Sequence, residues 1–448
     1  MILILGGGLA GMSTAYHLGD RPHLVLEGES SPGGLCRTRV VDGYHFDYTG
    51  HLLHLRDPRA IELVDAFYPD VFDDVGRVAR IRSMGADLPF PYQANLHGLP
   101  REFVAEAIVG FTETLGREVP DDPTTSFRDW ALAVFGPGIA RGFMFNYNRK
   151  LFRREPEAMT ADWVSWAVPK PNLEEVVRGA LGLSNEGMGY NPTFRYPRSG
   201  GIGVIPDAFA ERMTHLRCDA RVVGVDLDAR TAEIAGGETV SYERLVVTTP
   251  LPGFLSMCRG GSVDWAAEAA RLDWSVVGCV NLGVERAGVG DGVHWIYFPD
   301  PDVPFYRVGF PSNFSAAVAP PGTSSLYVAF GLRRDEAFDP SDLVDRAIAT
   351  LVREGILRSD DPIAVRDTIR IDPGFVIFDR ARQEVMARVI PALEALGVHP
   401  IGRYGAWTYS YMERAILDGL ELAERILSLI HNSEPKRPDV KSRMTSTA

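Results

Sequence analysis

Cysteine is scarce in this chain, and its placement argues against two classes of protein. Only four of the 448 residues are cysteines, and they lie far apart, at Cys36, Cys218, Cys258 and Cys279. No CxxC pair and no zinc-type spacing occurs, so neither a disulfide framework nor a structural zinc centre is indicated. We therefore expect reduced thiols, a cytoplasmic protein and no metal site.

Long apolar runs and an excess of positive charge are also missing. No apolar run approaches the ~18 residues that a membrane-spanning helix needs. The N-terminal "MILILGGGLAG" lacks the basic region that begins a signal peptide. The net charge of −13 argues against general affinity for nucleic acid. An anionic substrate would therefore need a local group of arginines.

The chain does have the length and the apolar content, 45%, for two or three domains. It opens with a βαβ unit, because "MILIL" predicts a buried strand, "LAGMSTAYHL" a helix and "HLVLE" a second strand. Residues 60–183 have a mostly helical pattern, and residues 263–377 are rich in predicted strands. The segment "MERAILDGLELAERILSLI" predicts a final helix.

The turn after the first strand carries a dinucleotide-binding pattern. Gly6, Gly8 and Gly11 have GxGxxG spacing, which permits a tight turn, close approach of a pyrophosphate and close packing of the helix. The positive end of the helix dipole then faces the phosphates. Glu27 follows the second strand, 16 residues after Gly11, and can accept hydrogen bonds from ribose hydroxyls.

A second glycine pair extends this pattern. Gly33, Gly34 and Arg37 in "SSPGGLCRT" suit a cofactor that continues beyond its first nucleotide. Together with "FDYTGH", these features resemble the opening of the FAD-binding flavoproteins of the amine oxidase and UDP-galactopyranose mutase superfamily. The resemblance implies FAD, with Glu27 on the AMP ribose and Arg37 near the phosphates or the flavin. The segments "ARVVGVD", around Val222, and "LVVTTP" resemble a later strand pair that contacts the adenine in these flavoproteins.

This resemblance also implies a fold and a domain order. We expect an α/β protein with a Rossmann-type, GR2-like FAD-binding domain, an inserted helical domain and a mixed or antiparallel β-sheet substrate domain. The FAD-binding domain would comprise residues 1–78, 199–260 and 386–431, the helical insertion 79–198, and the sheet domain 261–385. The tail, 432–448, lacks apolar periodicity and is expected to be disordered.

Three later segments resemble the mutase branch of the superfamily. "GHLLHL" carries His51 and His54, three residues apart, like a mutase loop beside the flavin. "PDVPFYRVGFPSNFS" carries Arg307 in a context similar to an arginine that contacts the substrate diphosphate. "GRYGAWTYSYMERAILDG" resembles the C-terminal motif, in which Arg403 and Tyr409 would contact the diphosphate. In the same motif, Gly402, Arg403 and Met412 would lie against the cofactor.

The mutase resemblance implies a reaction without net redox change. Reduced flavin N5 attacks the anomeric carbon and displaces the nucleotide diphosphate; the flavin–sugar adduct then lets the ring open and reclose between pyranose and furanose forms. A reductant such as NAD(P)H would reduce the flavin, and the chain could form an oligomer. Two alternatives remain open: an FAD oxidase or dehydrogenase of the amine oxidase or protoporphyrinogen oxidase type, and a non-catalytic flavin-binding partner protein.

Some positions depart from the mutase pattern or stay unassigned. Tyr411 stands where the mutase motif has an aspartate. The substrate residues of the helical domain have candidates by region only, which are Arg149, Arg153 and Tyr196.

The two histidines allow three interpretations. On an extended segment, residues three apart point to opposite faces. A metal site would need further ligands, and none stands nearby in metal spacing. Ordinary packing and a role in adjusting the polarity around flavin N5 both remain open for His51 and His54.

Overall fold

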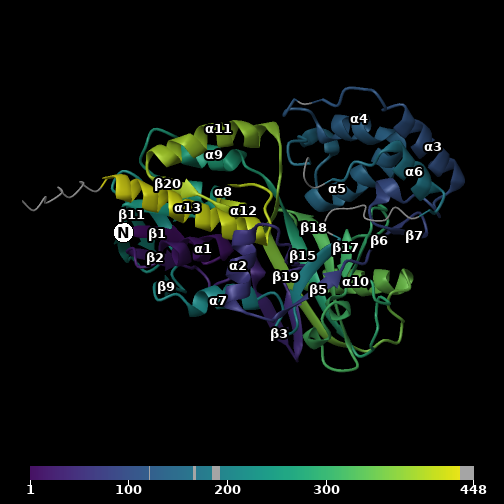
Figure 1. Cartoon of the computed structure of the whole chain (residues 1–448), viewed down its shortest axis with the longest axis horizontal. Helices are drawn as coiled ribbons and strands as arrows, with labels where there is room; N and C mark the ends of the chain where they lie inside the picture. The colour runs from purple at the N-terminus through teal and green to yellow at the C-terminus, as the bar shows by residue number, and fades with distance from the viewer. Residues whose placement is uncertain (121, 165–167, 184–191, 434–448) are drawn as a thin grey trace, which may run out of the picture.

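A five-stranded parallel sheet forms one half of the molecule in this computed structural model, which describes residues 1–120, 122–164, 168–183 and 192–433 (Figure 1). Its central strand, β1 (Ile2–Leu5), is buried along its whole length, which explains its uninterrupted apolar sequence. The strand order is β20-β13-β1-β2-β9, and the other strands are β2 (His23–Leu26), β9 (Leu216–Arg217), β13 (Arg244–Val247) and β20 (Val398–Pro400). Segments from three distant parts of the chain therefore build one sheet.

Two helices cross closely over this sheet. Helix α1 (Leu9–Leu18) packs against the long helix α13 (Met412–Ser433). A side chain at Gly419 would come within 2.7 Å of the Ala10 carbonyl oxygen, so glycine permits the close crossing. The remaining helices of this half are α2 (Pro58–Phe67), α7 (Val204–Glu211), α8 (Leu251–Met257), α9 (Trp265–Arg271), α11 (Arg380–Ala395) and the short α12 (Gly402–Gly405).

Three smaller sheets are also present among the described residues. A four-stranded sheet has the order β12-β11-β10-β14, formed by β10 (Val222–Asp226), β11 (Thr231–Ile234), β12 (Thr239–Ser241) and β14 (Cys258–Arg259). An antiparallel hairpin joins β3 (Thr38–Val41) to β4 (Tyr44–Asp47). Strand β5 (Phe72–Gly76) pairs with β8 (Thr193–Pro197).

The other half is built on a seven-stranded mixed sheet with the order β19-β15-β18-β17-β16-β6-β7. All its pairings are antiparallel except β16 with β6. Helix α10 (Pro340–Arg353) packs on this sheet over a separate apolar core. The strands are β6 (Ala79–Ser83), β7 (Ala86–Pro89), β15 (Trp274–Val284), β16 (Trp295–Tyr297), β17 (Arg307–Gly309), β18 (Ser324–Arg333) and β19 (Ile363–Val376).

The region expected to be mostly helical, residues 60–183, also contains β5, β6 and β7. Strands β6 and β7 lie at the edge of the seven-stranded sheet, although the expected helical insertion began at residue 79. Burial alternates along "ARIRS" in β6, as it does in a strand with one buried face. Five such residues are too short a run to stand out beside the longer helical patterns around them.

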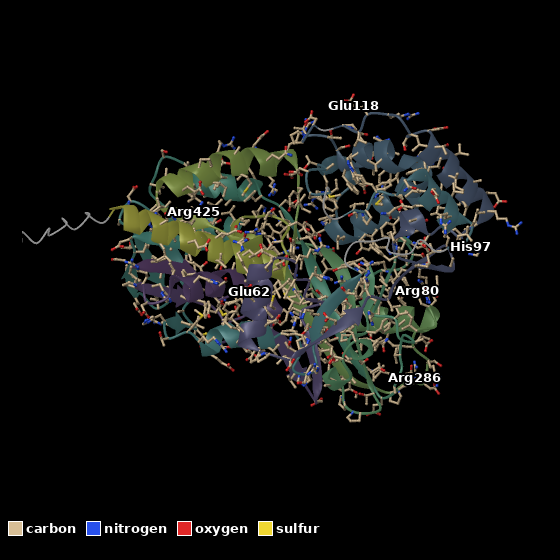
Figure 2. The ribbon with its side chains drawn as sticks, viewed as in Figure 1. Glu62, Arg80, His97, Glu118, Arg286 and Arg425 are labelled. Atoms are coloured by element: carbon tan, nitrogen blue, oxygen red, sulfur yellow. The ribbon has the colours of Figure 1, made fainter. Side chains whose placement is uncertain are left out.

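The helical insertion consists of α3 (Arg101–Thr112), α4 (Phe127–Ile139), a π-helical turn (Ala140–Phe145), α5 (Asn146–Phe152) and α6 (Leu173–Ala180). Side chains cap the N-termini of two of these helices. Ser126 accepts from the Asp129 N–H at the start of α4, and Asn172 forms a capping box with Glu175 at the start of α6. His97 lies at the opposite end of the molecule from Arg425 on α13 (Figure 2).

Helix α5 is seated directly on the seven-stranded sheet. A side chain at Gly331 in β18 would meet the Lys150 carbonyl oxygen at 1.9 Å, so the two backbones touch there. Lys150 Nζ donates to the carbonyl oxygens of Phe298 and Phe305, at 2.8 and 3.2 Å. These contacts hold α5 against the sheet.

Among the described helices, none is both long and apolar enough to cross a membrane. Helix α13 continues to Ser433, beyond the expected start of the disordered tail at 432. The rest of that tail, 434–448, lies outside the described residues.

Candidate active site

The turn between β1 and α1 has the geometry of a phosphate cradle. Gly6 has φ +104°, a left-handed conformation that favours glycine. A side chain at Gly8 would meet no protein atom within 4 Å, so open space lies in front of the helix N-terminus. A side chain at Gly11 would lie 2.1 Å from the Gly6 carbonyl oxygen, so only glycine lets α1 pack here. The conformation of Gly6, the open space at Gly8 and the close packing at Gly11 are compatible with the roles that their spacing predicts.

Glu27 lies beside this turn at the carboxyl end of β2. Its Oε2 accepts from the Gly7 N–H at 2.7 Å and its Oε1 from the Glu29 N–H at 2.9 Å. A carboxylate has about four acceptor positions, so it retains capacity for ribose hydroxyls.

The other predicted cofactor residues surround the same end of the sheet. The Gly33 N–H donates to the Gly7 carbonyl at 2.7 Å, and Gly34 lies against Gly8. Arg37 donates to the Gly34 carbonyl at 2.9 Å and lies 5.2 Å above the ring of Tyr48.

Contributions from the later chain complete this cradle. The Ala220 N–H donates to the Glu27 carbonyl oxygen at 2.8 Å, and β10 begins two residues later, at Val222. Gly402 has φ +73°, and a side chain there would meet the Ala10 side chain at 2.8 Å. Met412 is buried in an apolar cluster with Leu9 and Met12 of α1. The open Gly8 cradle and the free acceptor capacity of Glu27 fit a dinucleotide.

The two histidines have different surroundings. Burial, and then the charges of Arg403 and Arg307, lower the pKa of His51 to about 4. Its Nδ1 is buried and has no hydrogen-bond partner among the described residues. His54 instead lies 3.1 Å from the Thr193 carbonyl oxygen and beside the ring of Phe194. Burial lowers its pKa to about 4 as well, but its charged neighbours are Arg77 and Arg56.

The structure brings Arg307, Arg403 and Tyr409 to one place, beside His51. Arg307 starts β17, lies 5.3 Å above the ring of Tyr327, and has a buried Nε without a partner among the described residues. Arg403 in α12 lies 4.8 Å above the ring of Tyr409. Burial raises the pKa of the Tyr409 hydroxyl to about 12, although Arg403 and Arg307 act in the opposite direction. Both arginines therefore act on both His51 and Tyr409.

A ring of aromatic side chains around Arg307 was not predicted from the sequence. Tyr147 of α5 lies 5.5 Å from Tyr297 and 6.1 Å from Tyr306, measured between ring centroids. Trp163, from the helical insertion, stacks on Tyr409 at 5.8 Å. Phe143 and Tyr147 stand four apart and share a face, a helical spacing that could have indicated this wall. The other members are Tyr297 of β16, Tyr306 immediately before β17, Tyr327 of β18 and Phe375 of β19.

Two of the candidates assigned by region lie elsewhere. The Tyr196 hydroxyl donates to Asp47 Oδ2 at 2.7 Å. Arg153 pairs with Glu336 at 3.5 Å. Tyr411, which stands at the position of the expected aspartate, is 42% exposed at the start of α13.

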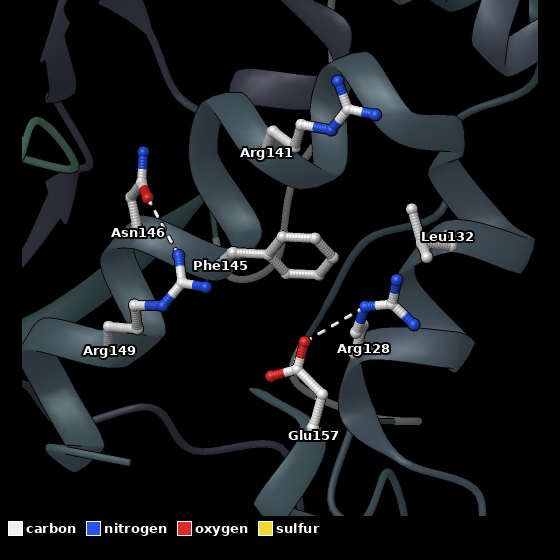
Figure 3. Close-up of a pocket in the computed structure, with 7 residues that line it drawn as sticks. All are labelled: Arg128, Leu132, Arg141, Phe145, Asn146, Arg149 and Glu157. Atoms are coloured by element: carbon white, nitrogen blue, oxygen red, sulfur yellow. Dashed lines mark hydrogen bonds and ion pairs between the residues drawn. The ribbon is translucent and has the colours of Figure 1, made fainter. Parts of the chain in front are cut away.

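Arg149 lines a cavity of about 460 Å³ on the helical insertion. Figure 3 shows the Phe145 ring at its centre, with Arg149 turned toward Asn146 and Arg128 toward Glu157. Arg149 pairs with Glu155 at 2.6 Å and Arg128 with Glu157 at 3.1 Å. Acidic partners therefore offset the charge of these arginines, whereas Arg307 and Arg403 have no such ion pair within the part of the chain that the structure describes.

The fold and this site define a class of flavoenzyme. The family model of flavin-containing amine oxidoreductases matches residues 9–427, and the chain belongs to that family. Its cofactor is FAD, and the predicted α/β FAD-binding fold is confirmed.

Within this class, the solved structure of reduced UDP-galactopyranose mutase is similar over 96% of this chain and 94% of its own, with 27% identity and a TM-score of 0.90. The predicted resemblance to UDP-galactopyranose mutase-like flavoproteins is thereby confirmed. Two more distant structures share the fold. A putative protoporphyrinogen oxidase from Exiguobacterium sp. 255-15 has 14% identity and a TM-score of 0.71, covering 95% of this chain and 98% of its own. Wild-type putrescine oxidase bound to putrescine has 16% identity and a TM-score of 0.68, with the same coverage.

Proposed function

We propose that this flavoenzyme is a nucleotide-sugar mutase, which interconverts pyranose and furanose forms of a sugar attached to a nucleotide diphosphate. The observation that carries the proposal is the convergence of Arg307 and Arg403 on His51 and Tyr409, at a site lined with tyrosines. The similarity to reduced UDP-galactopyranose mutase supports the same assignment.

The two arginines supply what a diphosphate needs in this protein. A nucleotide diphosphate carries about two negative charges, and a chain with net charge −13 repels it except where cations are concentrated. Guanidinium groups bind phosphate oxygens in a bidentate fashion and stay charged at any pH of interest. The Arg307 Nε has no partner among the described residues, so a ligand oxygen would satisfy a buried donor.

The tyrosines provide neutral donors beside these charges. The pKa of Tyr409, about 12, keeps its hydroxyl protonated at neutral pH, so it can donate to a diphosphate oxygen. The tyrosines around Arg307 close the site with rings, which limits access of water. Aromatic faces such as Tyr147 also suit stacking with a nucleotide base.

His51 is neutral at physiological pH, and its buried Nδ1 can donate or accept a hydrogen bond with a bound cofactor or substrate. FAD, when bound in its reduced form, supplies the nucleophile for the anomeric carbon. The chain's own contribution is to hold the diphosphate leaving group, orient the sugar and keep the site dry.

An amine oxidase activity fits the site less well. An alkylamine substrate is a cation near neutral pH, and it would enter beside two guanidinium groups that repel it. The fold is shared with putrescine oxidase, but the fold alone does not assign a reaction. The arginines therefore favour an anionic substrate.

A screen of nucleotide sugars tests the proposal. The FAD-loaded protein is reduced anaerobically and incubated with a panel of nucleotide-diphosphate hexoses, and the product ring size is read by chromatography and NMR. We expect a furanose product from at least one of them with reduced protein and none with oxidised protein. Oxidation of amines or porphyrinogens with stoichiometric peroxide, together with no binding of uridine diphosphate, would contradict the assignment.

A further inference from the structure

The segment between Arg403 and Tyr409 contains a strained residue. Trp407 has φ +48°, and its side chain is fully buried. A bulky residue rarely adopts this left-handed conformation. Such a conformation persists only where surrounding contacts enforce it. Trp407 therefore needs a group that holds it, and its strain lies two residues from a proposed diphosphate ligand.

Arg382, in the first turn of α11, holds this residue. Its Nε and Nη2 both donate to the Trp407 carbonyl oxygen, at 2.9 and 2.7 Å. The Arg382 side chain is only 11% exposed. Its backbone N–H donates to Asp379 Oδ1 at 2.7 Å, and its guanidinium lies 4.1 Å from the centre of the Phe378 ring. Contacts with Asp379 and Phe378 therefore hold Arg382 in the position from which it binds the Trp407 carbonyl oxygen.

The same guanidinium faces the helical insertion. Arg382 Nη1 lies 3.8 Å from Asp162 Oδ2, a distance of charge attraction rather than a direct hydrogen bond. Asp162 is oriented by Thr160, whose hydroxyl donates to Oδ1 at 2.7 Å, and by Gln383 at 3.3 Å. Asp162 immediately precedes Trp163. Arg382 therefore lies beside Asp162, which precedes Trp163, and binds the carbonyl of Trp407, which is two residues before Tyr409. Trp163 and Tyr409 form the ring stack.

We propose that Arg382 is a positioning residue for the nucleotide diphosphate. It fixes the Trp407 turn and the distance between Trp163 and Tyr409, which in turn orients Tyr409 and the Arg403 guanidinium above it. Arg382 acts through other residues and is not proposed to touch the substrate. The inference rests on the proposed function for its choice of ligand, but the tie to Trp407 can be tested without any ligand.

The test uses Arg382→Met and Arg382→Lys in the full-length, FAD-loaded protein. The matched control is Arg388→Met on the same helix, where an exposed arginine pairs with Glu268. Four quantities are measured: FAD content, Tm, affinity for uridine diphosphate by calorimetry, and hydrogen exchange of the peptide covering residues 403–411.

We expect Arg382→Met to weaken binding of uridine diphosphate about tenfold or more while FAD content stays at the wild-type level. Exchange in residues 403–411 should become faster. Arg382→Lys retains a single point donor and should recover part of the affinity. Arg388→Met should match wild type in binding and in exchange.

Three results would overturn the inference. One is Arg382→Met with binding within twofold of wild type; another is unchanged exchange in residues 403–411; the third is loss of FAD and nucleotide together in proportion to the fall in Tm, which marks a purely structural tie. If Arg382→Met does not fold, Arg382→Lys is judged by the same criteria. Wild-type protein that binds no uridine diphosphate contradicts the proposed function instead, and exchange alone then decides the role of Arg382.

Discussion

Arg307 is the residue on which the charge argument depends most. It lies within a ring of tyrosines, and its Nε donor is buried without a partner among the described residues. An uncompensated buried donor costs about 1–3 kcal/mol, which a ligand oxygen would relieve. The side chain is therefore better placed for binding an anion than for stabilising the empty fold.

Replacing Arg307 should separate ligand binding from cofactor binding. We expect Arg307→Ala to weaken uridine diphosphate binding about 10- to 100-fold, since a charge-assisted hydrogen bond contributes about 1.5–3 kcal/mol. FAD content should not change. The measurement is calorimetric titration, with Arg333→Ala as control, because Arg333 lies on the neighbouring strand and pairs with Asp335 at the surface. Equal loss of both ligands would mean that Arg307 supports the fold.

His51 makes a second prediction at this scale, through pH. An unfolded histidine titrates near pH 6.5, whereas burial and the two arginines lower the pKa of folded His51 to about 4. Between these values the unfolded chain binds a proton that the folded chain does not. The contribution of His51 is therefore complete above about pH 6.5 and is lost as the pH falls toward 4.

We expect His51→Gln to reduce the loss of stability between pH 7 and pH 5, by at most about 1.4 kcal/mol per pH unit. Urea unfolding at both pH values gives the measurement. His97→Gln, at an exposed position of the helical insertion, is the matched control. A wild-type pH dependence in His51→Gln would mean that this side chain titrates normally in the folded protein.

At the scale of elements, substitutions in the β1–α1 turn distinguish effects on folding from effects on cofactor binding. Gly8 and Gly11 are three residues apart, but their surroundings differ. Space in front of Gly8 is open to a ligand, whereas the space at Gly11 is filled by the Gly6 carbonyl. Two alanine substitutions in one turn should therefore have different effects.

Gly8→Ala should fold with nearly the wild-type Tm and lose at least about tenfold in FAD affinity, because its methyl group occupies the phosphate cradle. Gly11→Ala should lower the stability of the protein itself by about 1–3 kcal/mol, since overpacking forces the backbone apart. Gly253→Ala, on α8 with no neighbour within 4 Å, is the control. Thermal unfolding and FAD titration of the apoprotein distinguish the three. The interpretation fails if Gly8→Ala binds FAD normally.

The elements that the sequence predicted best are those defined by local pattern. The glycine spacing and the apolar run at the start of the chain specify β1, the turn and α1, because these residues contact one another. Strands β6 and β7 were missed, since their place depends on pairing with β16, more than 200 residues later. The spacing of Phe143 and Tyr147 indicates a shared helix face, but the sequence does not indicate that Tyr147, or Trp163 from a turn, meets a distant sheet.

At the scale of the whole molecule, the candidate site is assembled from parts of the chain that only the fold brings together. His51 comes from the loop after β4, Arg307 from β17 and Arg403 from α12, and the helical insertion adds Tyr147 and Trp163. The resemblance of short motifs pointed to the first three residues. Their convergence could not be obtained from spacing, because it depends on how two sheets and a helical insertion pack.

The most direct test of the proposed mutase activity counts product molecules per reducing equivalent. The FAD-loaded protein is reduced once under anaerobic conditions, excess reductant is removed, and a nucleotide sugar that it converts is added. A reaction without net redox change predicts many molecules of furanose product for each reduced flavin, with the flavin still reduced at the end. One product molecule or fewer per flavin, accompanied by flavin oxidation, would contradict the proposal and assign the protein to the oxidases or dehydrogenases.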